Sequence, residues 1–141
     1  MEVSDIRRRV RDAIERARRQ ASERRARNDE ATRAFARLLE DMAVPLFKQV
    51  ANVLKVEGYA FTVFTPSGGV RLMSDRHSDD YLEITLDTGG DAPRVIGHTS
   101  RSRGRRIVEA EHIVGSGAPA AIQEEDLLAF VLKELEPFVE K

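Results

Sequence analysis

The chain has 141 residues, of which 41% are apolar and 33% are charged. This length allows one ordinary domain with its own hydrophobic core, and the charged fraction exceeds the usual value of about a quarter. Because the sequence contains no cysteine, disulfides, thiolate metal sites and cysteine nucleophiles are excluded.

Charge and hydropathy narrow the class of protein further. Residues 1–40 contain 12 arginines and 8 acidic residues, a net charge of +4, whereas residues 41–141 have a net charge of −5. A basic segment on an acidic body can self-associate or bind an anionic partner. The first residues lack the apolar stretch of a secretory signal, and no apolar run approaches the ~18 residues that span a bilayer. We therefore expect a cytoplasmic protein that is not bound to a membrane.

The first 57 residues predict one long helix. They contain no glycine and one proline, and they are rich in Ala, Arg, Glu and Leu, which favour helix. Pro45 indicates either a kink in a nearly continuous rod or a stop near Met42 and a new helix with Pro45 in its first turn. We favour the kinked rod, ended by Gly58.

An apolar seam with heptad-like spacing marks the start of this helix. The seam consists of Val3, Ile6, Val10, Ala13 and Ala17. The same register then meets arginines, and a broader apolar stripe resumes at residues 31–53. A helix of ~50 residues is ~75 Å long, about twice the diameter of a globule of this mass. We therefore expect a projecting, charged helical arm over residues 1–30 and an α+β globular domain over residues 31–141.

From Tyr59 the apolar period changes from that of a helix to that of a strand. The pattern predicts five strands, at residues 59–65, 70–74, 81–87, 94–100 and 105–114. Glycine-rich or polar segments separate them, including a turn at Ser102–Gly104. Each gap is too short for a crossover helix, so the sheet is expected to be an antiparallel meander.

A C-terminal helix is predicted from Glu124, because three acidic residues at 124–126 favour a helix N-terminus. Its broad apolar face should pack on the sheet, with Leu132 fully buried, and Phe130 makes the helix apolar almost all round. Together with the residue 35–56 stripe, this helix is expected to cover one face of the sheet. The fold class is therefore α+β.

No set of residues with catalytic or metal-binding spacing stands out, and we expect no enzyme activity, metal or cofactor. His77 lies in an acidic loop that lacks the glycine and distant glutamate of a calcium loop. His98 and His112 lie on opposite arms of the last hairpin without a third ligand. Ser67 and Ser116 adjoin glycines but lack the strand–turn–helix setting of an activated nucleophile.

The last hairpin carries a cluster of positive charge. The cluster consists of Arg101, Arg103, Arg105 and Arg106. Such a tip can bind phosphates, although no aromatic residues for base stacking lie nearby. The simpler interpretation is an edge hairpin that charge keeps soluble.

The leading hypothesis is a non-enzymatic scaffold or adaptor that self-associates as a homodimer through the seam of its N-terminal helix. The +4 arm and −5 body favour an antiparallel coiled coil or an arm-on-body arrangement over a parallel coiled coil, because parallel arms would align like charges. A further protein partner is compatible with such a role. The alternative is a binding module for an anionic partner such as nucleic acid, acting through the arginine hairpin and the basic arm. A small-ligand protein or enzyme with a site between sheet and helix is a third possibility, without a chemical signature.

Overall fold

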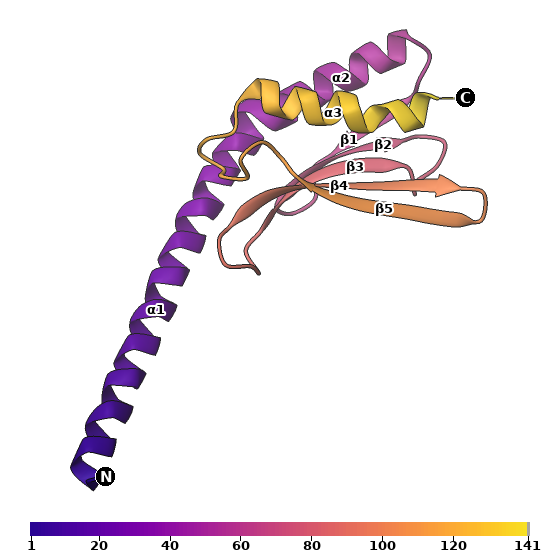
Figure 1. The fold of residues 1–141 in the computed structure, drawn as a ribbon. Helices are drawn as coiled ribbons and strands as arrows, with labels where there is room; N and C mark the ends of the chain where they lie inside the picture. The colour runs from indigo at the N-terminus through magenta and orange to yellow at the C-terminus, as the bar shows by residue number, and fades with distance from the viewer. Residues whose placement is uncertain (141) are drawn as a thin grey trace.

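A nearly continuous helical rod, Val3 to Val56, dominates the computed structural model, which describes residues 1–140 (Figure 1). The rod consists of α1 (Val3–Leu38), a π-helical segment η1 (Leu39–Ala43) and α2 (Val44–Val56). The direction of the rod changes where α1 passes into α2 (Figure 1). The structure thus confirms the long N-terminal helix with a kink near Pro45.

The kink has a local cause. Pro45 lacks a backbone N–H, and its ring crowds the carbonyl four residues earlier, at Asp41. The turn that contains Asp41 is the π-helical η1, immediately before Pro45 at the start of α2. Widened π-turns and prolines are the usual causes of sharp helix bends. The proline therefore redirects the rod without ending it.

Gly58 ends the rod as expected, because it adopts a φ of +94°, which side chains disfavour. The Gly58 N–H donates to the Lys55 carbonyl at 3.1 Å, and the Tyr59 N–H donates to the Leu54 carbonyl at 2.8 Å. These two bonds form the paired closure of a Schellman motif. The chain then turns back along the sheet.

Five antiparallel strands follow in sequential order, as a meander. They are β1 (Phe61–Phe64), β2 (Gly69–Ser74), β3 (Tyr81–Asp87), β4 (Arg94–Arg103) and β5 (Arg106–Ile113). The expected topology is confirmed. The last turn lies at Gly104–Arg105, because Arg103 pairs with Arg106 and β4 is longer than expected. Gly104 supplies the positive φ, +64°, that the first position of a tight two-residue hairpin turn requires.

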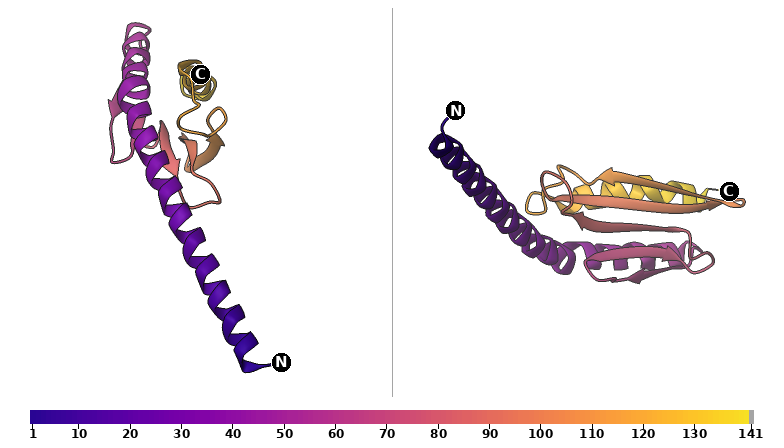
Figure 2. Two further views of the ribbon diagram at one scale, coloured as in Figure 1. Left: turned by 90° about the vertical axis from the view of Figure 1, so that its left-hand side faces the viewer. Right: turned by 90° about the horizontal axis from the view of Figure 1, so that it is seen from below.

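Two helices cover the same face of this sheet (Figures 1 and 2). α2 lies over β1 and β2, and α3 (Glu124–Val139) lies over β3 and β4. The Gln123 side chain and Asp126 cap the start of α3 reciprocally. The fully buried core between helices and sheet includes Phe47, Val70, Leu72, Leu82, Ile84, Val95, Leu127 and Val131. The opposite face of the sheet has no helix over it.

The expected burial of Leu132 is wrong: this residue is 53% exposed, whereas its neighbour Val131 is completely buried. A helix that lies on one face of a sheet buries a single stripe, and Leu132 falls outside it. Phe130 is 9% exposed, and its position depends on Gly97 of β4. A Cβ atom at Gly97 would lie 2.2 Å from the Phe130 ring. The missing side chain therefore makes room for the aromatic ring.

The N-terminal part of α1 extends away from this domain. The first buried residues of α1 are Ala34, Phe35 and Leu38, and those before them are exposed or only partly shielded. Figure 1 and the left view of Figure 2 show α1 continuing past the sheet on the side of its uncovered face. We call residues 3–30 the arm.

Candidate functional site

The apolar seam of the arm is uncovered in the single chain. Val3 is 72% exposed, Ile6 47% and Val10 51%, and the smaller Ala13 and Ala17 are exposed as well. Exposed large apolar residues in a row, rather than scattered singly, mark interaction surfaces. The structure therefore brings the five expected seam residues together on one helix, with no other element against them.

Sequence reasoning missed one member of this surface, Ile14, which is 45% exposed. A heptad pattern assigns it outside the seam, whereas the 3.6-residue period of the unbroken α1 places it one turn beyond Val10. Ala17 lies about five whole helical turns before the buried Phe35, so both residues lie on the same side of α1. The arm's apolar stripe thus continues the side of α1 that packs into the core.

Basic and acidic residues lie on different sides of the arm when its residues are placed around a helix of 3.6 residues per turn. The arginines that border the apolar stripe are Arg7, Arg9, Arg18, Arg25 and Arg27, and Arg24 lies within it. Most acidic residues lie on the opposite side of the helix, namely Asp5, Asp12, Glu15, Glu23 and Glu30. The arm therefore has a face that is both apolar and strongly basic. We call it the basic face.

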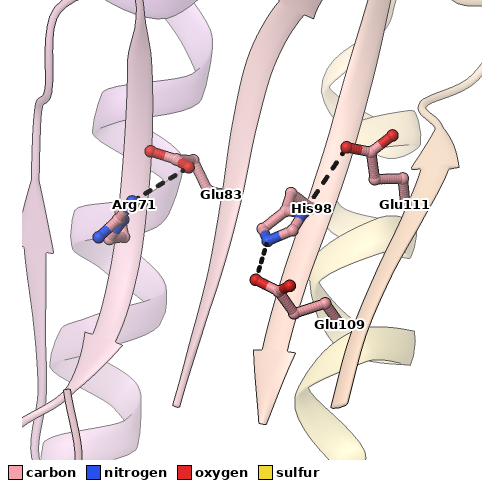
Figure 3. Close-up of polar contacts among 5 residues, drawn as sticks. All are labelled: Arg71, Glu83, His98, Glu109 and Glu111. Carbon is pink, nitrogen blue, oxygen red and sulfur yellow. Dashed lines mark hydrogen bonds and ion pairs between the residues drawn. The ribbon is translucent and has the colours of Figure 1, made fainter. Parts of the chain in front are cut away.

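A second candidate surface is the uncovered face of the sheet, where polar contacts run across four strands (Figure 3). The Arg71 guanidinium of β2 lies 4.0 Å from the centre of the Tyr81 ring and 3.3 Å from Glu83 on β3. The Tyr81 ring also adjoins His98 of β4, with ring centres 5.8 Å apart. Arginine over an aromatic face is a favourable cation–π arrangement.

His98 lies between two glutamates of β5. Its Nε2 is 3.4 Å from Glu109, and its Nδ1 is 3.8 Å from Glu111 (Figure 3). These pairs are ionic only when His98 is protonated. The two carboxylate side chains remain 60% and 70% exposed. They therefore keep acceptor capacity for further cations from solvent or from a partner.

The same face of β5 also carries exposed apolar residues. Side chains alternate along a strand, so Ile107, Glu109, Glu111 and Ile113 all lie on the uncovered face. Ile107 is 55% exposed and Ile113 is 47% exposed. β5 is also an edge strand, with unpaired backbone groups along one side. We call these four side chains the acidic strip.

The four arginines of the last hairpin differ in exposure. Arg103, Arg105 and Arg106 are exposed at the tip, but Arg101 is partly buried. Arg101 lines a hollow on the helix-covered side of the sheet, next to Phe138 and Glu134 of α3. Three of the four arginines are therefore free to meet an anion at the hairpin tip.

The remaining histidines, His77 and His112, lie on different elements. His77 lies in the β2–β3 loop, and His112 is 3.5 Å from Glu134 of α3, on the opposite side of the sheet from His98. Across residues 1–140, no three His, Asp or Glu side chains are grouped closely enough to bind a metal ion. The candidate site is therefore a pair of surfaces: the basic face of the arm and the uncovered face of the sheet.

In the part of the chain that the structure describes, no helix is both long and apolar enough to span a membrane. The chain matches no protein-family model, no curated protein and no solved structure.

Proposed function

We propose that the protein is a non-enzymatic scaffold or adaptor that self-associates through the arm. The observation that carries this proposal is the row of exposed apolar residues at Val3, Ile6, Val10 and Ile14, on a helix that its own domain leaves uncovered. Apolar area of this kind favours association because burial against a partner removes it from water.

Length and stability support the same proposal. At 1.5 Å per residue, a helix of 36 residues is about 54 Å long. Isolated helices gain little stability in water, and most helical stability in proteins comes from packing of an apolar face. A partner surface for residues 3–21 would supply that packing. Neighbouring globular domains would then be held at a distance set by the rod, which is the property of a scaffold.

The test is the mass of the protein in solution. We expect a dimer, with twice the 15.8 kDa mass of the chain, in sedimentation or light scattering at micromolar concentration. The paired substitutions Ile6→Asp and Val10→Asp should produce a monomer whose sheet domain stays folded, because neither residue belongs to the core. Asp12→Asn with Glu15→Gln, on the opposite side of the helix, is the matched control. A monomeric unmodified protein at high micromolar concentration would contradict the proposal.

A second candidate function is the binding of an anionic partner such as nucleic acid, favoured by the exposed Arg103, Arg105 and Arg106 at the hairpin tip. Changing all three to Ser should leave the melting temperature nearly unchanged, because exposed charges contribute little to stability. Under this function the change should abolish salt-dependent binding to a polyanion such as heparin or duplex DNA. Absence of polyanion binding by the unmodified protein at low salt would remove this candidate.

A further inference from the structure

The arm and the uncovered face of the sheet lie on the same side of the molecule (Figures 1 and 2). The arm continues past the sheet on the uncovered side (Figures 1 and 2). Its apolar stripe follows the direction of the buried Phe35, so it faces the side of α1 on which the domain lies. The two surfaces do not meet within one chain, because the unbroken α1 leads the arm away from the sheet.

The chemistry of the two surfaces is complementary. The basic face has isoleucine and valine bordered by arginine, and the acidic strip has isoleucine at both ends with two glutamates between. The glutamate side chains are more than half exposed, and a guanidinium can bond a carboxylate through two parallel N–H groups. Isoleucine can therefore pack on isoleucine while arginine pairs with glutamate.

The two surfaces also match in length. Val3 to Ala17 spans about 21 Å along an α-helix, at 1.5 Å per residue. Ile107 to Ile113 spans about 20 Å along a strand, at roughly 3.3 Å per residue. One arm laid along β5 would thus cover the whole acidic strip.

We propose that the arm of one copy lies on the acidic strip of a second copy, and that the second arm does the same in return. This proposal rests on the proposed self-association and names the surface that receives the arm. Each copy offers one arm and one strip, so a reciprocal exchange gives a closed, two-fold dimer. Arm-against-arm pairing is disfavoured by comparison, because arginines border the stripe on both sides and would face arginines in either orientation.

The effect of charge reversal on dimer affinity distinguishes this arrangement from a coiled coil of two arms. Glu109→Arg with Glu111→Arg should weaken dimerisation roughly tenfold or more, because like charges then meet across the interface. Glu136→Arg with Glu140→Arg changes the charge equally on the helix-covered side and should leave the dimer intact. On the arm, Arg7→Glu with Arg18→Glu should weaken the dimer, whereas the neighbouring pair Arg8→Glu with Arg19→Glu, on the far side of the helix, should not.

Mixing the two reversed proteins gives the decisive measurement. The arm-reversed and strip-reversed proteins should each be mainly monomeric alone, yet form a heterodimer together, because both interfaces again combine opposite charges. Recovery on mixing also shows that neither variant is misfolded. A strip-reversed protein that dimerises as well as the unmodified one, while Ile6→Asp with Val10→Asp does not, would overturn this inference and leave self-association standing. A monomeric unmodified protein would overturn both.

Discussion

The arm and the domain both contain regularly spaced apolar residues, but these residues lie in opposite environments. In the domain, apolar side chains from α2, α3 and four strands converge on one core, and residues such as Phe47 and Leu82 are completely buried. In the arm, the valine and isoleucine side chains are 45% to 72% exposed. The difference shows that apolar periodicity identifies the side of a helix suited to packing. It does not show whether the packing partner belongs to the same chain.

Removing a fully buried side chain from the domain should cause the largest loss of stability. Phe47→Ala removes a fully buried ring between α2 and the sheet, and we expect a loss of roughly 3–5 kcal/mol in the free energy of unfolding. The measurement is denaturant unfolding followed by circular dichroism. Val3→Ala, in the arm, is the matched control and should change the unfolding free energy of a monomeric preparation very little. Equal losses for both variants would mean that arm and domain are not distinct in stability.

A smaller loss is expected from filling the space opposite Phe130. Gly97→Ala places a methyl group against the Phe130 ring, and such overpacking costs roughly 1–3 kcal/mol. Adding Phe130→Leu, which shortens the side chain there, should restore part of the loss. Thermal unfolding of the two variants and the unmodified protein tests this coupling. Additive effects of the two substitutions would show that the glycine has no specific relation to the ring.

The smallest effect concerns the exposed side of α3. Leu132→Ala should cost less than about 1 kcal/mol, because the side chain is already half in water. Val131→Ala, next to it, should cost more, since Val131 is completely buried. Denaturant midpoints of the two variants give the comparison directly. A larger loss for Leu132→Ala would indicate that this side of α3 is covered in solution.

Much of the fold was predictable because its signals are local. The glycine-free helix, its end at Gly58 and the alternation of Tyr81–Asp87 depend on backbone preference and on neighbours within a few residues. The meander followed from connections too short for a crossover. The seam of the arm was also found from spacing, although a heptad template left out Ile14, which the α-helical period includes.

The candidate receiving surface was not predictable, because it combines residues far apart in the chain. Arg71, Tyr81, His98 and Glu109 become neighbours only through the register of four strands. The partial burial of Arg101 likewise depends on which part of β4 lies next to α3.

The order of helices and strands, the kink near Pro45 and the meander could be predicted from the sequence, because they depend on local backbone chemistry and connection length. Which apolar residues are buried depends instead on packing between segments that are far apart in the chain. Phe130 is buried because Gly97 of β4, which lies directly against α3, leaves space for its ring. Leu132 is exposed because only one side of α3 packs on the sheet. The position of the arm beyond the uncovered face of the sheet (Figure 1) also depends on packing, because α1 is one unbroken helix whose end is held in the core by Phe35 and Leu38.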